Sequence, residues 1–184
     1  MSRRGAAIGV LCAMSAIVAC TQKGSAPPVQ SRATLADSAE QVLIDVHTLL
    51  TVHGVQRGEL FADTAYVFDE NSRFELRKVR ATFNTATGVK DGVMSADRGR
   101  YNLRQQLLEG FGNVVIVTTD GKRLTSPQIR YMQGLNEVSS DTSFVLVQPG
   151  RTVEGIGLKA DPQLTRVQIL RNLGARGSFT LPNQ

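Results

Sequence analysis

The side chains that most often carry enzyme chemistry are few in this sequence, and their spacing does not bring them together. His47 and His53 are the only histidines, and they lack metal-ligand spacing. Asp69 and Glu70 form a carboxylate pair, but they lie in a turn-like segment, where no glycosidase arrangement is indicated. No cysteine remains as a nucleophile once the N-terminal signal described next is removed. The sequence therefore predicts that the protein is not an enzyme and holds neither a metal nor a cofactor.

The residue whose chemistry the sequence does specify is Cys20. Arg3 and Arg4 precede an uncharged run of small and apolar residues, a pattern typical of a secretory signal. The run ends at 17–20 with Ile-Val-Ala-Cys, which resembles a bacterial lipobox, where small residues let a signal peptidase reach the bond before the cysteine. We therefore expect a lipoprotein signal peptide over 1–19 and lipid attachment at Cys20.

An uncleaved membrane anchor is the alternative interpretation of this run. The run is shorter than the roughly 20 apolar residues that span a bilayer as a helix, so cleavage is favoured. Cys12 follows the bulky Leu11 and would leave with the signal, so the mature chain would fold without a disulfide. Loss of Arg3 and Arg4 lowers the net charge from +5 to +3. Nucleic acid is not an expected partner, because the signal directs the protein out of the cytoplasm.

Behind the signal, composition divides the chain into three parts. Residues 20–41 are rich in Gly, Ser and Pro, which favours a flexible, lipid-anchored linker. Residues 42–175 are predicted to form one domain, and 176–184 a flexible C-terminal tail. Between 35 and 50 the apolar residues fit both a strand and a helical stripe. We favour a strand, with room for a short helical turn before it.

Alternating apolar residues separated by turn residues fill the predicted domain. Four sets each share one parity along the chain, as expected for one face of a strand. They are Leu60, Ala62, Tyr66 and Phe68; Leu108, Val114 and Ile116; Val138, Phe144 and Leu146; and Val167, Ile169 and Leu173. Asp120-Gly121 is the strongest hairpin signal. The pattern predicts an all-β, antiparallel fold.

A loose repeat runs through these strands. Four pairs recur roughly every 30 residues, which suggests a unit of about two strands stacked on its neighbours. The pairs are Ala62-Asp63, Ala96-Asp97, Thr125-Ser126 and Ala160-Asp161. A tyrosine follows each of the first three, namely Tyr66, Tyr101 and Tyr131.

Six fragments between residues 42 and 175 occur in an order that resembles one known family. They are Leu60-Phe61-Ala62-Asp63 with Tyr66, Ser95-Ala96-Asp97 with Tyr101, Leu108-Glu109-Gly110 leading to Val114, Leu124-Thr125-Ser126 with Tyr131, Ser139-Ser140-Asp141, and Gly155-Ile156-Gly157-Leu158. In this order they resemble the LptC family, the periplasmic bridge of lipopolysaccharide export, related to LptA and OstA-type proteins. The resemblance implies a V-shaped antiparallel β-jellyroll, an open β-sandwich. It also implies that lipid A passes from an inner-membrane ABC transporter through this domain to an LptA-like jellyroll.

The implied function needs an apolar groove, because each acyl methylene left in water costs about 0.8 kcal/mol and a twelve-methylene tail about 10 kcal/mol. Alternate strand residues would line such a groove, although each of them could equally be ordinary core. The candidates for the lipid groove are Phe68, Phe74, Phe83, Tyr101, Ile116, Phe144 and Leu146.

The resemblance also implies contact with partners at both ends of the sheet. The N-terminal strands would meet the transporter, and a strand from about Leu164 to Leu173 would meet the LptA-like protein. Candidate interface residues are Gly155, Gly157, Arg166, Val167, Ile169 and Arg171. The two arginines could instead protect a strand edge. Gly157 indicates a bend or a close contact within a strand, with a flexible turn as the alternative.

The expected localisation is the periplasm, with the protein held to a membrane by its lipid. Members of the family are usually anchored by one uncleaved inner-membrane helix, so the predicted lipoprotein signal is a departure. Thr21 after the cysteine leaves both membranes open, and we favour the inner membrane, where the transporter lies. The alternative function is a non-transporting β-rich envelope lipoprotein that acts as an assembly scaffold.

Overall fold

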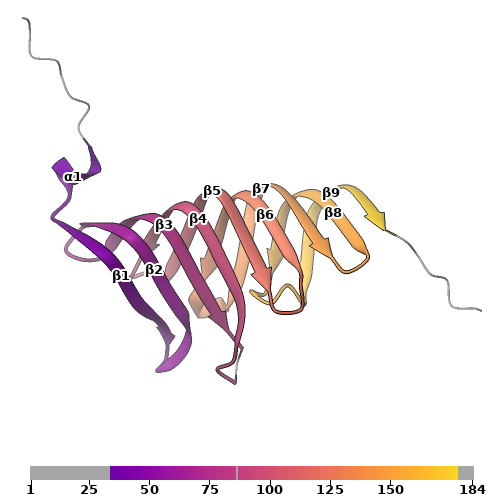
Figure 1. Cartoon of the computed structure of the whole chain (residues 1–184), viewed down its shortest axis with the longest axis horizontal. Coiled ribbons are helices and arrows are strands. Elements are labelled where there is room, and N and C mark those ends of the chain that lie inside the picture. The colour runs from indigo at the N-terminus through magenta and orange to yellow at the C-terminus, as the bar shows by residue number, and fades with distance from the viewer. Residues whose placement is uncertain (1–33, 86, 178–184) are drawn as a thin grey trace, which may run out of the picture. The chain divides into compact units, whose positions relative to one another are not determined.

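The computed structural model describes residues 34–85 and 87–177, almost all of which belong to one β-sheet. Within them lie a short helix, α1 (Leu35–Ser38), a 3-10 turn, η1 (Gln133–Leu135), and nine strands. The strands are β1 (Gln41–Val52), β2 (Val55–Phe68), β3 (Arg73–Asn84), β4 (Lys90–Asn102), β5 (Leu107–Thr118), β6 (Arg123–Met132), β7 (Glu137–Gln148), β8 (Arg151–Ala160) and β9 (Val167–Gly177). Each pairs antiparallel with the next, so the sheet is ordered β1 to β9 and does not close (Figure 1).

The all-β prediction is confirmed, and the ambiguous segment 35–50 contains both alternatives in turn. The helical turn is α1, whose N-terminus is capped because the Thr34 N–H donates to Asp37 Oδ2 at 2.6 Å. β1 follows as a strand. At the predicted Asp120-Gly121 hairpin, β5 and β6 are joined by a tight turn in which Gly121 has φ +84°. No helix in the described residues has the length and apolar character needed to cross a membrane.

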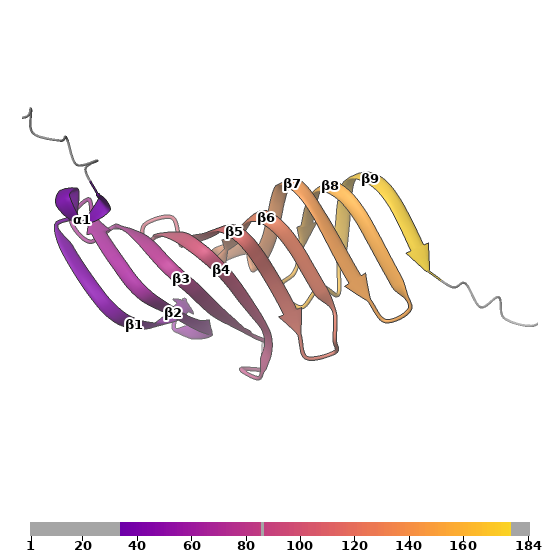
Figure 2. The same ribbon diagram turned by 45° about the horizontal axis from the view of Figure 1, so that its top comes forward.

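Every strand bends where it crosses one line that runs across the sheet. Along this bend line the ladders skip or shift residues, and five of the residues there have positive φ: Asp45, Lys78, Gly112, Asn113 and Gly157. The full bend line comprises Asp45, Asp63, Lys78, Asp97, Gly112-Asn113, Pro127, Asp141-Thr142, Gly157 and Leu170. Because a bulge bends its strand and increases twist, an aligned row of such irregularities folds the whole sheet over. The curved strands are visible in a second view (Figure 2).

The bend creates two layers that face each other across an apolar interior. Phe83 of β3 and Tyr131 of β6 have ring centroids 4.7 Å apart although β4 and β5 separate their strands. Neighbouring strands lie about 4.8 Å apart, so within one flat layer these rings would be much more distant. The contact is therefore made across the interior.

Each layer contributes one continuous row of inward-facing residues in direct register. The first layer is defined by the row Leu60, Ala81, Met94, Ile116, Leu124, Leu146 and Val153. The second layer is defined by the row Val67, Phe74, Tyr101, Leu108, Tyr131, Val138, Ala160 and Val167. All members are buried except Phe74 and Val167, which pack against the others. The core thus extends along the sheet from β2 to β9.

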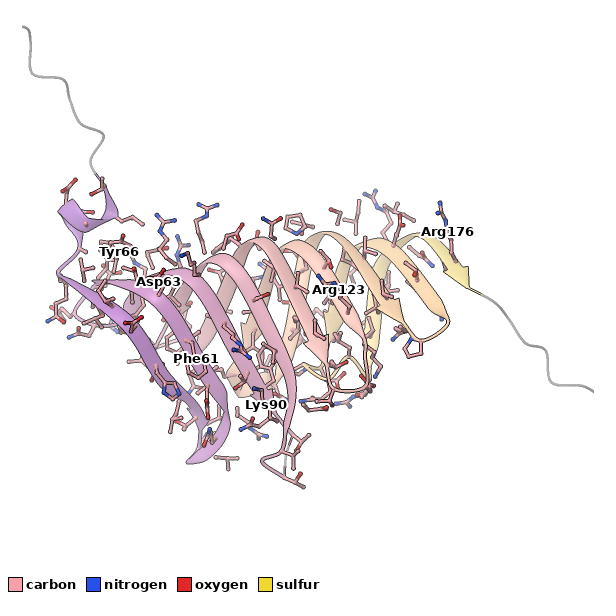
Figure 3. All side chains as sticks on the ribbon, in the orientation of Figure 1. Phe61, Asp63, Tyr66, Lys90, Arg123 and Arg176 are labelled. Atoms are coloured by element: carbon pink, nitrogen blue, oxygen red, sulfur yellow. The ribbon has the colours of Figure 1, made fainter. Side chains whose placement is uncertain are left out.

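Because of the bend line, the predicted inner face of β2 differs from the observed one. Leu60 and Ala62 point inward as expected, but Ala65 and Val67 replace Tyr66 and Phe68 on the inner face. The cause is a step of three residues at Asp63, which moves the following side chains to the opposite face because the strand period is two. The prediction that Tyr66 and Phe68 share a face with Leu60 is therefore wrong. Figure 3 labels Phe61, Asp63 and Tyr66, which follow one another along β2.

Three of the four repeated pairs mark the bend line. In Ala62-Asp63 and Ala96-Asp97 the small residue is buried and the aspartate lies outside at the bend. Asp63 pairs with Lys78 of the next strand at 3.2 Å, and Asp97 Oδ2 accepts a hydrogen bond from Asn113 at 2.7 Å. Thr125-Ser126 occupies the equivalent place in β6. Ala160-Asp161 lies beyond the bend, at the end of β8, so the repeat does not extend to it.

The C-terminal strand is displaced from its predicted position. It was expected from Leu164 to Leu173, but β9 runs from Val167 to Gly177. Leu164 belongs instead to the preceding loop, with φ +53° and a side chain that is 1% exposed. The Asp161 carboxylate causes the difference, because it accepts the backbone N–H groups of Thr165 and Arg166 and so holds a turn there.

Candidate functional site

Five of the seven proposed groove residues lie in the interior between the layers. Phe83 and Ile116 are completely buried, Phe144 and Leu146 are 2% exposed, and Tyr101 is 8% exposed. Phe74 is partly exposed and packs beside Tyr101, with ring centroids 6.2 Å apart. These six residues belong to or border a single apolar cluster that reaches both layers.

Phe68 lies apart from the other six, on the outer face. The Arg73 guanidinium covers its ring at 4.4 Å from the centroid. Arg73 also bonds Asp69 at 2.8 Å, and this bond lowers the pKa of the Asp69 carboxyl. Phe68 therefore belongs to a turn cluster at the β2–β3 connection, outside the interior.

Polar side chains gather at one edge of the interior, which sequence reasoning missed. The Tyr131 hydroxyl donates to Asn136 Oδ1 at 3.1 Å, and Gln133 Nε2 donates to the Tyr101 hydroxyl at 3.2 Å. Burial raises the pKa of Tyr131 to about 12, against the opposing effect of the positive charge on Arg57. Among the described residues, Arg57 Nε and Gln133 Oε1 are the buried side-chain atoms without a hydrogen-bond partner. The tyrosines of the repeat were the only sequence signal for this cluster.

The polar cluster lies where the two layers meet again, far from the bend line. We call this edge the rim: Phe83, Asn84 and Gly92 from the first layer, with Tyr131, Gln133 and residues 161–166 from the second. Phe83 packs edge-on against Tyr131, and the Gln163 side chain donates to the Asn84 carbonyl at 3.5 Å. The interior is therefore covered on the rim side in this conformation.

Near the C-terminal edge the interior approaches the surface. A surface hollow of about 390 Å³ is bordered by Phe144, Gly155 and Leu173. Phe144 is also a member of the core cluster. Gly155 leaves room for it, since a Cβ at this position would lie 2.8 Å from atoms of the Phe144 ring. Phe144 thus borders both the apolar core and a surface hollow near β9.

The two outermost strands carry most of the large apolar side chains that are exposed on strands. On β1, Ile44 is 64% exposed and Leu49 52%, and on β9 Leu170 is 58% and Leu173 62% exposed. Each strand also has one side without a neighbouring strand. An unpaired edge with apolar side chains is a template for adding a strand from another chain. Both ends of the sheet are therefore candidate docking sites.

The predicted interface residues fall into three places. Gly155 and Gly157 lie within β8, and Gly157 has φ +75° on the bend line, so it is part of a bent strand and not of a flexible turn. The remaining residues divide between the rim and β9: exposed Arg166 in the loop, half-buried Val167 and Ile169 against the core, and exposed Arg171 on the strand.

The histidines and carboxylates form ordinary surface contacts. His47 Nε2 lies 3.4 Å from Glu59 Oε2, and its ring stacks on Phe61 at 4.2 Å. In residues 34–85 and 87–177, no three His, Cys, Asp or Glu side chains are grouped as metal ligands. The predicted signal peptide 1–19, Cys20 and most of the predicted linker 20–41 lie outside the described residues, as do residues 178–184 of the predicted C-terminal tail.

An open antiparallel sheet, bent into two layers around an apolar interior, places the chain in the β-jellyroll class of folds. The chain is similar to the crystal structure of LptH, the LptA homologous periplasmic component of the conserved lipopolysaccharide transport device from Pseudomonas aeruginosa. The TM-score is 0.50 at 18% sequence identity, over 67% of this chain and 89% of that chain. At this identity the likeness concerns the fold.

The family follows from the sequence match. A family model described as "Lipopolysaccharide-assembly, LptC-related" matches residues 7–176, so the chain belongs to the LptC-related family. No curated protein matches the sequence. Family and fold together give the chain a role in the lipopolysaccharide-transport bridge of the cell envelope. The predicted family and the predicted open jellyroll are both confirmed.

Proposed function

We propose that this protein holds the acyl chains of lipid A between its two layers and passes them from an inner-membrane ABC transporter to an LptA-like jellyroll. The observation that carries the proposal is the continuous apolar interior, built from two rows of directly paired residues that reach from β2 toward β9. A groove that extends along the sheet can shield a lipid over the whole distance between the two edges.

The direction and the partners of transfer are assigned to the two edges. As the resemblance to the LptC family implies, β1 would meet the transporter and β9 the LptA-like protein. Each edge has exposed apolar side chains and no neighbouring strand, which suits the addition of a partner strand. Transfer along the sheet then needs no release of acyl chains into water, which would cost about 10 kcal/mol for a twelve-methylene tail.

Membrane attachment through Cys20 completes the proposal. A diacyl anchor at Cys20 binds a membrane stably, whereas a single chain binds only marginally. We favour the inner membrane. Metabolic labelling with a fatty acid tests the anchor: the parent protein should incorporate label, and Cys20→Ala should not. Equal labelling of the two proteins would rule the anchor out.

Photo-crosslinking tests lipid binding with controls that differ only in the face of the strand. A photoreactive phenylalanine analogue at Phe144, which is 2% exposed and inward, should capture lipopolysaccharide in cells. The same analogue at Val145, the neighbouring residue on the outer face, should capture little. Tyr101 and Asn102 form a second inward and outward pair on β4. Equal yields at inward and outward positions would contradict lipid binding in the interior.

Mass spectrometry of the gently purified protein separates this function from a scaffold. Lipid A retained by the parent protein supports transport. Transporter and LptA-like partner recovered without any lipid, together with absent crosslinks at Phe144, would favour an assembly scaffold.

A further inference from the structure

The loop between β8 and β9, residues 161–166, touches strands on the opposite side of the interior. Gln163 Nε2 donates to the carbonyl oxygen of Asn84 in β3 at 3.5 Å. A Cβ on Gly92, at the start of β4, would lie 3.4 Å from the Pro162 carbonyl oxygen. Strands β4 to β7 lie between β3 and β8 in the sheet. The loop can make these contacts only by reaching across the rim from the second layer to the first.

The side chain of Leu164 closes the space beneath this loop. Leu164 is 1% exposed and belongs to the same apolar cluster as the two rows of the core, and Pro162 beside it is also buried. A loop residue that is part of the core is unusual in this protein, where the other connections carry exposed apolar residues such as Leu103, 52% exposed, and Leu135, 67% exposed. The loop therefore covers the core at the rim.

The backbone of Leu164 adopts a conformation that leucine disfavours. Its φ of +53° lies in the left-handed region, where a Cβ crowds the backbone and glycine is the residue at ease. Such a conformation persists only where the surroundings hold it. Here the Leu164 N–H donates to the Asp161 carbonyl at 2.9 Å, and the Asp161 carboxylate accepts the N–H groups of Thr165 and Arg166 at 3.0 and 2.7 Å.

We infer that residues 161–166 form a latch that holds the rim shut and must move away before an elongated apolar ligand can enter the interior. The closing contacts are few: the Leu164 side chain, the Gln163–Asn84 bond and the approach of Pro162 to Gly92. The strained backbone of Leu164 means that release of the latch regains part of the energy lost with these contacts. For lipid A as the ligand, the inference rests on the proposed function.

A reversible disulfide across the rim tests the latch. No cysteine follows Cys20 in the sequence, so Gly92→Cys combined with Pro162→Cys introduces the only cysteine pair in a soluble form that begins after residue 20. N-phenyl-1-naphthylamine, a dye that fluoresces in apolar sites, reports access to the interior. The oxidised double variant should bind the dye at least fivefold more weakly than the same protein after reduction. Equal dye binding in the two states, with the disulfide verified by mass, contradicts the latch.

Leu164→Gly gives the opposite perturbation and does not depend on the disulfide. Glycine removes the side chain that fills the rim and tolerates the positive φ, so dye binding should rise several-fold while the β-sheet circular dichroism stays that of the parent. Leu103→Gly removes an exposed loop leucine and should change nothing. Leu124→Ala makes a cavity in the middle of the first row without touching the rim. A rise for Leu124→Ala equal to that for Leu164→Gly would assign the effect to a cavity and overturn the latch.

The two proposals fail in different ways. If lipopolysaccharide crosslinks to Phe144 equally in the oxidised and the reduced double variant, the latch is wrong and transport stands. If no variant captures lipopolysaccharide but Leu164→Gly still gains dye binding, the latch stands and the proposed ligand is wrong.

Discussion

At the scale of single residues, Gly157 is the position where sequence and structure agree most closely on a constraint. It has φ +75° in the middle of β8, and a Cβ there would lie 2.8 Å from Leu170 Cδ1. Leu170 belongs to β9 and is 58% exposed, so its side chain can move aside. The backbone strain cannot be relieved in this way, which makes the positive φ the stronger reason for glycine.

Substitution of Gly157 should therefore disturb the C-terminal edge while the domain still folds. We expect Gly157→Ala to lower the free energy of unfolding by about 1 to 2 kcal/mol. Gly157→Arg should abolish copurification with the LptA-like protein, the partner proposed for β9. Gly121→Arg is the matched control, since Gly121 also has a positive φ, lies in the β5–β6 turn away from β9, and a Cβ there would meet nothing within 4 Å. Urea denaturation and affinity purification measure the two effects. Copurification of Gly157→Arg at the level of the parent would show that the partner tolerates this site.

The buried hydroxyl of Tyr131 makes stability depend on alkaline pH. Its folded pKa is raised to about 12 from an ordinary value of 10.0, mainly by burial. The native state thus keeps a proton that the unfolded chain releases, so the stabilising contribution is complete below pH 10 and is lost as pH rises from 10 through 12. A difference of this size corresponds to roughly 2 to 3 kcal/mol.

Tyr131→Phe isolates this contribution. The variant should lose about 1 kcal/mol near neutral pH, because the hydrogen bond to Asn136 disappears. Between pH 10 and 12, however, its free energy of unfolding should fall less steeply than that of the parent in urea titrations. Parallel pH profiles for the two proteins would mean that Tyr131 does not titrate with a raised pKa.

At the scale of strands, the bend line explains which faces could be predicted from the sequence. Alternation identified strands, hairpins and most inward residues, because these depend on near neighbours in the chain. In β5 and β7 the bend inserts an even number of residues, so Val114 and Phe144 kept the predicted parity. In β2 the step is odd, and Tyr66 and Phe68 point outward. Only the pairing between strands shows where such a step falls.

The candidate site likewise contains residues that local alternation could predict and residues that it could not. Phe83, Tyr101, Ile116, Phe144 and Leu146 were found because they alternate on their strands, and all five are buried. The rim depends on contacts between residues far apart in sequence, such as Gln163 with Asn84, and no local pattern reports such a contact. The predicted C-terminal strand began at about Leu164, but the Asp161 carboxylate holds this residue in a loop.

Between β6 and β7, side-chain hydroxyls replace the backbone ladder at the bend line. The pairing is interrupted between Thr125 and Arg130. Ser126 and Ser140 Oγ lie 2.9 and 2.8 Å from the Gln128 carbonyl oxygen and 3.2 Å from each other. Because both serines are buried, we expect these hydroxyls to satisfy backbone acceptors that water cannot reach.

Removal of both hydroxyls should destabilise the sheet where the pairing of β6 and β7 is interrupted. We expect the double variant Ser126→Ala with Ser140→Ala to lose roughly 2 to 3 kcal/mol of unfolding free energy, since each lost bond contributes about 1 to 1.5 kcal/mol. Ser95→Ala, on the exposed face of β4, should change stability by less than about 0.5 kcal/mol. Urea unfolding followed by circular dichroism measures both. A double variant as stable as Ser95→Ala would show that water can replace the hydroxyls as the donor to these backbone acceptors.

At the scale of the whole described unit, the sheet has two free edges and one interior, so docking and lipid binding can be separated by mutation. Ile44 on β1 and Leu173 on β9 are 64% and 62% exposed, and neither belongs to the core cluster. Lysine at either position should leave folding unchanged. A charged lysine on an edge strand opposes the addition of another strand, as in natural edge protection.

Each lysine variant should therefore lose one partner and keep the other. We expect Ile44→Lys to lower recovery of the transporter at least fivefold with normal recovery of the LptA-like protein, and Leu173→Lys to do the reverse. Quantitative affinity purification from membranes measures both partners in the same sample, and crosslinking of lipopolysaccharide at Phe144 in the purified variants checks that the interior is intact. Since β1 and β9 are at opposite ends of the sheet order, a loss of both partners in either variant would mean that one edge serves both contacts. Lipid could then not pass along the interior from one edge to the other.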